Sequence, residues 1–229
     1  MIINFLGLIP ARKGSKRLKQ KNLKKLNNKK LIQYTFESSM KSKRIEKILL
    51  TSNDPAVIKL AKKFKLDFII KRPEKFSRDQ SSMEDVVKHT IKHLESSAIK
   101  VKNIILLQPT TPLRTSSDID NMVDHYIKKR LDYCVSVSKP ITHSLQIFHT
   151  KNNQINLNQN KKFKNFNHLF LNGSIYIFKV KNFLKNKKIY KSKVNYFMQG
   201  LNNSIDINNE LDFEIIKSLK SKIRKIKVV

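Results

Sequence analysis

A loop rich in cations follows the first apolar run of the chain, residues 2–9, which predicts a buried strand. The loop residues that could do chemistry are Arg12, Gly14, Ser15, Lys16 and Lys21. An arginine can bind phosphate oxygens through two parallel hydrogen bonds, and lysines add point charges. Gly14 allows a positive φ or a close backbone approach, so nearby N–H groups can bind an anion. The loop therefore predicts a polyphosphate site, with a solvated basic surface as the ordinary alternative. The glycine spacing of a P-loop is absent.

Two other stretches carry polar residues suited to ligands. Apolar and polar residues alternate over 205–208, which places Asp206 and Asn208 on one face of a predicted strand. Their oxygens could hold Mg²⁺ together with water and substrate phosphates, and helix capping is the alternative. Gln108 ends another predicted strand, before a loop that two prolines make rigid, and it can both donate and accept hydrogen bonds.

Three further residues are candidates with plain structural alternatives. Arg72 could bind phosphate or a pyrimidine carbonyl, or it is a surface arginine before a turn proline. Asn172 could bind a ligand or hold its turn. Gly173, at the start of a strand, predicts a bulge or a close backbone approach.

Strand and helix patterns alternate along the chain and predict an α/β fold. Strands are expected at residues 2–9, 45–51, 66–70, 104–108, 133–138, 172–178 and 194–198. Helices are expected at residues 31–40, 55–64, 82–94, after 115, near 182–184 and from 210, the last with a core face of Leu211, Ile215, Ile216 and Leu219. The length suits a single domain, 1–229, and the Asn- and Lys-rich residues 139–171 predict a projecting hairpin or subdomain.

The charge balance is unusual: 48 Lys and Arg against 17 Asp and Glu give a net charge of +31. Nucleic-acid binding and attraction of an anionic substrate are two explanations, and scattered lysine enrichment is the third. The lysines are spread out, and we find no nucleic-acid-reading motif and no Trp, which favours the third. The single cysteine, Cys134, predicts a small buried side chain in a reducing compartment. Without an apolar run long enough to span a bilayer or a signal-peptide pattern, we expect a cytoplasmic protein and no membrane partner.

Four blocks of the sequence, in order, resemble the acylneuraminate cytidylyltransferase family, also called the CMP-sialic acid synthetases. The blocks are Ile9-Pro10-Ala11-Arg12-x-Gly14-Ser15-Lys16-x-x-x-x-Lys21-Asn22-Leu23, Leu107-Gln108-Pro109-Thr110-Thr111-Pro112-Leu113-Arg114, Asn172-Gly173-Ser174-Ile175-Tyr176 and Ser204-Ile205-Asp206-Ile207-Asn208-x-Glu210-x-Asp212-Phe213. The resemblance implies a three-layer nucleotidyltransferase (Rossmann-like) fold with a mostly parallel mixed sheet. It also implies a homodimer, to which residues 139–171 contribute contacts. The implied reaction transfers CMP from CTP to the anomeric hydroxyl of a nonulosonic acid and releases pyrophosphate.

The resemblance also assigns roles to residues that match its motifs. CTP binding is implied for Ala11, Arg12, Gly14, Ser15, Lys16, Lys21, Asn22, Arg72 and Ser82. Binding of the sugar acid is implied for Gln108, Lys162 and Asn172. Asp206 and Asn208 would hold Mg²⁺, and Arg12, Lys21 and Asp206 form the expected catalytic set. Arg114 belongs to the second block and could be structural.

The sequence departs from the family pattern mainly in the half that would bind the sugar. Asn208 stands where the family has Asp, and Lys162 stands where a carboxylate-binding arginine is expected. These departures leave the sugar open among sialic, legionaminic, pseudaminic and other 2-keto acids. The alternatives to the implied enzyme are an enzyme for an eight-carbon keto acid, an inactive relative, suggested by Asn208, and a basic nucleic-acid-binding protein. Thr110 and Thr111 count against the first, because that enzyme would carry a metal-binding Asp after the fourth strand.

Overall fold

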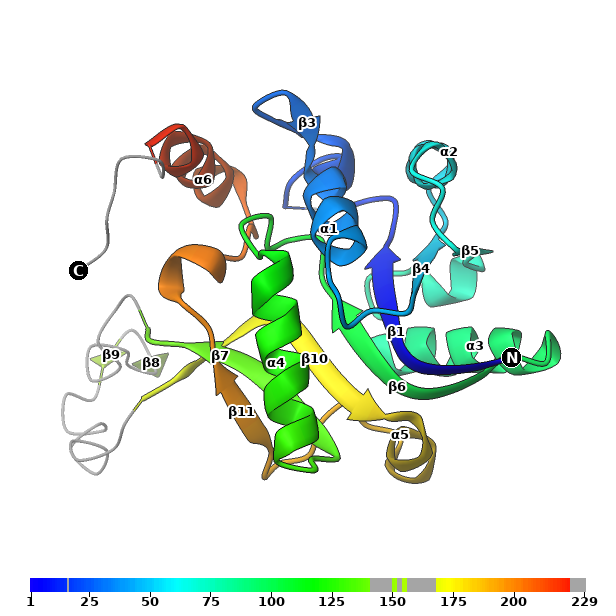
Figure 1. Cartoon of the computed structure of the whole chain (residues 1–229). Coiled ribbons are helices and arrows are strands. Elements are labelled where there is room, and N and C mark those ends of the chain that lie inside the picture. The colour runs from blue at the N-terminus through cyan, green and yellow to red at the C-terminus, as the bar shows by residue number, and fades with distance from the viewer. Residues whose placement is uncertain (16, 141–149, 152–153, 156–167, 223–229) are drawn as a thin grey trace.

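A computed structural model of the chain describes residues 1–15, 17–140, 150–151, 154–155 and 168–222. Seven strands form one sheet in the order β11-β7-β10-β6-β1-β4-β5 (Figure 1). Their bounds are β1 Ile2–Ala11, β4 Lys47–Ser52, β5 Phe68–Lys71, β6 Lys100–Leu107, β7 Tyr133–Ser138, β10 Phe170–Lys179 and β11 Asn195–Met198. Only β10 is antiparallel to its neighbours, β6 and β7; the other pairs are parallel. The expected α/β fold with a mostly parallel mixed sheet is confirmed.

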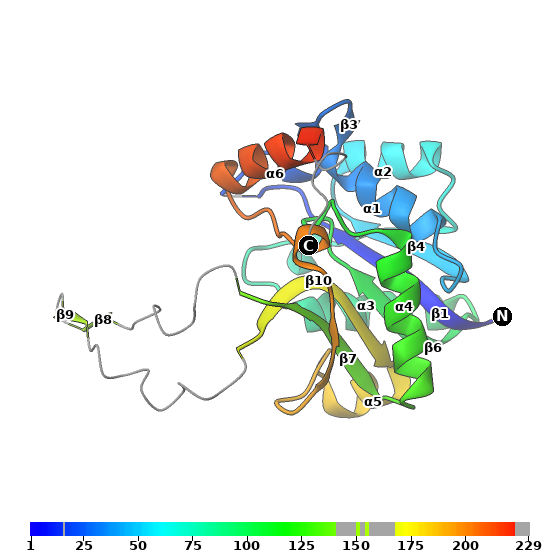
Figure 2. The same ribbon diagram turned by 60° about the vertical axis from the view of Figure 1, so that its left-hand side comes forward.

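Helices cover both faces of this sheet, which gives three layers (Figure 2). The helices are α1 Leu31–Met40, α2 Pro55–Lys63, α3 Met83–Ser96, α4 Ser116–Lys128, α5 Val180–Asn186 and α6 Glu210–Lys222. Buried side chains of α1, α2 and α4 pack with one face of the sheet, and those of α3 and α5 pack with the other. None of the helices in the described ranges is long and apolar enough to cross a membrane.

Short local signals set the starts of three helices. Asp54 accepts hydrogen bonds from the backbone N–H groups of Ala56, at 2.9 Å, and Val57, and Pro55 follows it at the first helical position of α2. Ser82 caps α3, and Thr115 forms a capping box with Asp118 at the start of α4. These helix starts match the sequence expectation.

A third, smaller core lies beyond the carboxyl ends of the parallel strands, where α6 and the short ribbon of β2 (Lys25–Leu26) and β3 (Lys29–Lys30) meet (Figure 1). Its buried members are Leu18, Leu26, Leu31, Ile207, Phe213 and Ile216. This core attaches the loop after β1 to the segment before α6. It therefore fixes the relative position of two stretches almost 200 residues apart.

Two sequence expectations for the carboxyl-terminal region are wrong. Ile216 is buried as expected, but Leu211 and Ile215 are 69% and 45% exposed and Phe213 is buried in their place, because α6 turns a partly different face to the small core. Residues 205–208 form no strand; one backbone bond, from Ile207 N–H to the Thr110 carbonyl (2.8 Å), holds this extended segment.

Most of the predicted projecting segment, residues 139–171, lies outside the described residues. In its described part, β8 (Thr150–Lys151) pairs antiparallel with β9 (Gln154–Ile155).

Candidate active site

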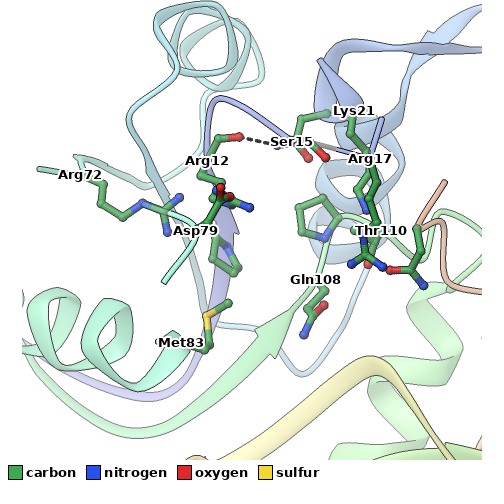
Figure 3. Close-up of a pocket in the computed structure, with 13 residues that line it drawn as sticks. Arg12, Ser15, Arg17, Lys21, Arg72, Asp79, Met83, Gln108 and Thr110 are labelled. Carbon is green, nitrogen blue, oxygen red and sulfur yellow. Dashed lines mark hydrogen bonds and ion pairs between the residues drawn. The ribbon is translucent and has the colours of Figure 1, made fainter. Parts of the chain in front are cut away.

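A pocket of about 420 Å³ opens at the carboxyl ends of β1, β5 and β6. Its lining residues are Pro10, Arg12, Ser15, Arg17, Lys21, Asn22, Arg72, Asp79, Met83, Gln108, Pro109, Thr110 and Asn208. In Figure 3, Arg72, Arg12, Asp79 and Met83 lie on one side, and Ser15, Arg17, Lys21 and Thr110 lie on the other. Four cations against one carboxylate give the pocket the charge of an anion site.

The loop after β1 is shaped by local backbone geometry and a few hydrogen bonds. Gly14 has φ +83°, the left-handed value expected for it, and a Cβ there would meet open space. Asn53 accepts a hydrogen bond of 2.8 Å from the Lys13 N–H, and Asn22 donates one of 3.2 Å to the Arg12 carbonyl. Leu18 is buried in the small core. The loop is therefore held at both ends, and Ser15, the residue after Gly14, lines the pocket.

Lys21 connects this loop to the segment before α6. Its ammonium group donates a hydrogen bond to the carbonyl of Ile207. Burial lowers the pKa of Lys21 below its usual 10.5, and the nearby Asp206 carboxylate partly opposes that shift. A partly desolvated cation in this position interacts more strongly with an incoming phosphate than a surface lysine does.

Arg72 brings buried donors to the opposite side of the pocket. Its side chain is only 4% exposed, and Nε and Nη2 have no hydrogen-bond partner among the described residues. Burial, with a smaller effect from Arg12, lowers the pKa of Arg72 to about 10. Buried donors are nearly always paired, so these N–H groups are suited to a ligand's oxygen or nitrogen acceptor.

Buried Arg114 positions the loop that carries Gln108. Its Nη1 donates to three oxygens, the carbonyls of Gln108 (3.1 Å) and Ser174 (2.8 Å) and the Thr111 hydroxyl (3.0 Å), and Nη2 donates to Thr35 (2.9 Å). Burial lowers the pKa of Arg114 to about 9. The Arg114 side chain does not line the pocket, so the geometry supports a structural role for this residue.

The start of β10 lies against Gln108. Gly173 has φ +70°, and the β10–β7 register shifts between Leu171 and Tyr176, which confirms the expected bulge. A Cβ on Gly173 would lie 3.7 Å from the Gln108 side-chain oxygen. Asn172, by contrast, is buried: it accepts hydrogen bonds from the Ser136 hydroxyl (2.6 Å) and the Ser174 N–H and donates to Gln199. The predicted contact of Asn172 with substrate is therefore not supported, and its role is to hold the turn.

The segment before α6 presents oxygen donors. Asn208 lines the pocket, and its amide NH₂ donates to Asp206 Oδ2 at 2.9 Å. The other carboxylate oxygen, Asp206 Oδ1, is buried with no partner among the described residues. Helix capping is done by Asn209 and Asp212, which exchange backbone–side-chain hydrogen bonds, and this leaves Asp206 and Asn208 free of the capping role considered from sequence. No cluster of three His, Cys, Asp or Glu suited to a metal occurs within the described ranges.

The predicted site residues other than Asn172 divide into four groups. Those that line the common pocket are Arg12, Ser15, Lys21, Asn22, Arg72, Gln108 and Asn208. Those beside it in the chain but not lining it are Ala11, Gly14 and Asp206. Ser82 caps α3 and lines a separate hollow between α3 and α5, so its expected place at the nucleotide is not supported. Lys16 and Lys162 lie outside the described residues.

Sequence reasoning missed six lining residues: Pro10, Arg17, Asp79, Met83, Pro109 and Thr110. Arg17 belongs to the same basic loop and could have been included on charge alone. Pro10, Pro109 and Thr110 flank residues that were chosen. Asp79 had no signal beyond its place in a polar loop, and Met83 looked like the first residue of a helix.

The chain matches the family model described as Cytidylyltransferase over residues 6–227. It is 27% identical over 240 residues to an N-acylneuraminate cytidylyltransferase from Escherichia coli O18:K1:H7, and the match covers all of this chain but 55% of that protein. It is 29% identical over 225 residues to a CMP-N,N'-diacetyllegionaminic acid synthase from Legionella pneumophila, and the match covers 95% of this chain and 96% of that protein.

Solved structures agree at the level of the fold. A CMP:2-keto-3-deoxy-manno-octonic acid synthetase complexed with CTP has a TM-score of 0.72 at 15% identity, covering 96% of this chain and 99% of that one. A 4-diphosphocytidyl-2C-methyl-D-erythritol synthase has a TM-score of 0.71 at 10% identity, covering 95% and 98%.

Proposed function

Because this chain belongs to the cytidylyltransferase family, we propose that it transfers CMP from CTP to the anomeric hydroxyl of a nonulosonic acid. The observation that carries the proposal is one pocket that Arg12, Lys21 and Asn208 line together. The hydrogen bond from Lys21 to the Ile207 carbonyl holds the loop after β1 against the segment before α6, which carries Asp206. Relatives named for N-acylneuraminate, N,N'-diacetyllegionaminic acid and pseudaminic acid supply the acceptor class.

The proposed reaction is an in-line displacement at the α-phosphorus of CTP. The anomeric oxygen forms the new P–O bond, the bond to the β-phosphate oxygen breaks, pyrophosphate leaves, and the hydroxyl proton passes to solvent. Arg12 and Lys21 neutralise the phosphates, and the free N–H groups of Arg72 hold the nucleotide. Rate enhancement then comes mainly from positioning and from fixed positive charge.

Magnesium fits the donors of the segment before α6. Asp206 Oδ1 is buried without a partner among the described residues, and the Asn208 amide oxygen is a second donor on the same segment. Mg²⁺ prefers oxygen ligands and commonly keeps water and substrate phosphates in its remaining positions. When bound, it would neutralise charge on the phosphates. With Asn in place of Asp at 208, the protein side of this site carries one negative charge rather than two, so we expect weak Mg²⁺ binding without nucleotide.

Gln108 and Lys162 are the residues we propose for the acceptor. Gln108 lies in the pocket near the β10 bulge, where its amide can bond hydroxyl groups. A lysine at 162 would keep the charge needed to bind a carboxylate but would lose the two-pronged contact of an arginine.

The test is pyrophosphate release with each of the four nucleoside triphosphates, against a panel of nonulosonic acids and an eight-carbon keto acid, with and without Mg²⁺. We expect turnover only with CTP, with a nine-carbon acid, and with Mg²⁺. Turnover only with another nucleotide would overturn the assignment. Tight, sequence-blind binding to nucleic acid at about physiological salt, with no turnover, would favour the basic binding protein instead.

A homodimer is proposed from the exposed apolar side chains around β7. Phe170 and Leu171 on β10 are 55% and 39% exposed, and Met198 on β11 is 45% exposed. Leu171 and Met198 both pair with Val137 of β7, from opposite sides. Such a concentration of exposed apolar residues is typical of an interface. Measuring the oligomeric state of the chain and of the Met198→Asp variant by sedimentation tests the proposed homodimer.

The use of CTP and the buried thiol of Cys134, whose pKa burial raises to about 12, favour a cytoplasmic location.

A further inference from the structure

The one carboxylate among the described lining residues of the pocket is Asp79, and it contacts Arg12. Arg12 Nη1 lies 2.5 Å from Asp79 Oδ1, and both side chains are about one-third exposed. In Figure 3, Asp79 lies beside Arg12, on the same side of the pocket as Arg72. The guanidinium proposed to bind a phosphate is thus already paired with an internal anion.

Carboxylates and phosphates bind the same N–H edge of a guanidinium, with similar hydrogen-bond geometry. We propose that Asp79 competes with the triphosphate for Arg12, so that nucleotide binding requires this ion pair to break. The inference rests on the proposed triphosphate site. It assigns Asp79 as a residue that lowers nucleotide affinity, whereas the other charged lining residues raise it.

The position of Asp79 in the chain suits this role. It lies in the turn between the 3₁₀ turn Glu74–Phe76 and α3. Ser81 closes that turn: its hydroxyl accepts a hydrogen bond from the Arg78 N–H (3.1 Å) and donates one to the Lys75 carbonyl (3.0 Å). Asp79 lies outside the three cores, so its side chain takes no part in the apolar packing of α3.

The test measures binding of tripolyphosphate, and separately of CTP, by calorimetry in Mg²⁺-free buffer. The full chain is compared with Asp79→Asn and with Asp124→Asn, a matched control that breaks the Arg44–Asp124 pair (2.6 Å) on the surface. An exposed ion pair is worth up to about 1 kcal/mol, so we expect Asp79→Asn to bind both ligands roughly two- to fivefold more tightly. Asp124→Asn should not differ from wild type. Unchanged binding by Asp79→Asn would overturn the inference, and weaker binding would also overturn it by showing that Asp79 orients Arg12 for the phosphate.

A second comparison asks whether Asp79 acts through Arg12. In an Arg12→Gln background the ion pair is absent, so Asp79→Asn should then change tripolyphosphate affinity much less. An equal gain in both backgrounds would mean that only general charge matters, which contradicts competition for Arg12. Tripolyphosphate has no base and needs no acceptor, so these results stand even if the chain proves unable to turn over CTP. Absence of CTP turnover would instead count against the proposed function alone.

Discussion

Replacing Lys21 with methionine should slow turnover far more than it weakens nucleotide binding. The ammonium group is partly buried, donates to the Ile207 carbonyl and lies near Asp206, so it is held where charge on the phosphates changes during transfer. Removing one preorganised electrostatic donor typically costs about 3 kcal/mol in the transition state, or roughly 10²-fold in kcat. The lost hydrogen bond to Ile207 should cost about 1 kcal/mol of unfolding free energy.

The matched control is Lys24→Met, three residues further along the chain. Lys24 pairs with Glu210 of α6 and lies 4.7 Å from the centre of the Phe213 ring, but it does not line the pocket. The Lys24→Met variant should lose a similar amount of unfolding free energy and keep its kcat. Steady-state pyrophosphate release, with urea unfolding of both variants, separates the two effects. If Lys21→Met kept kcat within about threefold of wild type, the reasoning about Lys21 would be refuted.

The same residue predicts a pH dependence. Burial lowers the pKa of Lys21 below 10.5, and the charged form is the one that binds phosphate. Activity should therefore be full at lower pH and fall as the pH rises through that lowered pKa. In Lys21→Arg the guanidinium stays charged, so any remaining activity should persist to higher pH. If the fall of kcat/KM at high pH occurs at the same pH in Lys21→Arg as in the wild type, a group other than Lys21 causes it.

Three further predictions concern the rest of the site. Asn208→Asp adds a second carboxylate beside Asp206 and should lower the half-saturating Mg²⁺ concentration roughly tenfold, measured by calorimetry with CTP and no acceptor; no change would argue that 208 is not a ligand. Arg114→Lys cannot make all four of its buried hydrogen bonds and should lose about 3 kcal/mol of unfolding free energy in urea; a loss under 1 kcal/mol would contradict its positioning role. Gly173→Ala, at φ +70°, should lose about 1–2 kcal/mol from backbone strain, read from the same urea transitions, and wild-type stability would show that the bulge relaxes freely.

The framework of the fold could be predicted because its signals are local. Asp54 with Pro55, and Thr115 with Asp118, place helix starts through contacts within four residues. Short apolar runs mark the buried strands in the same way. Periodicity places Ile216 of α6 in the core correctly but also places Leu211 there, because the two side chains are equally apolar. Packing in the small core with Leu18 and Leu26 buries Ile216 and leaves Leu211 exposed.

Residues that line the pocket could be predicted where motif and chemistry coincide, as at Arg12 and Lys21. It was missed where the role depends on distant partners. Asn172 looks like a ligand-binding amide in sequence, but Ser136 and Gln199 use its hydrogen-bonding groups. Asp79 carries no pattern at all, and its importance appears only when the loop before α3 is placed against Arg12, 67 positions earlier.

The insertion of β10 between β6 and β7 has a consequence for synthesis on the ribosome. The parallel set β5-β4-β1-β6 is complete once Leu107 has emerged, whereas β7 has no neighbour in the sheet until β10 and β11 are made. The edge of β6 that β10 will cover must therefore stay unpaired while about 70 more residues are translated. The loop after β1 then lies on a nascent half-sheet before Ile207 and Phe213, which pack with its Leu18, have been made. A chaperone that shields strand edges would have its clearest target in this interval.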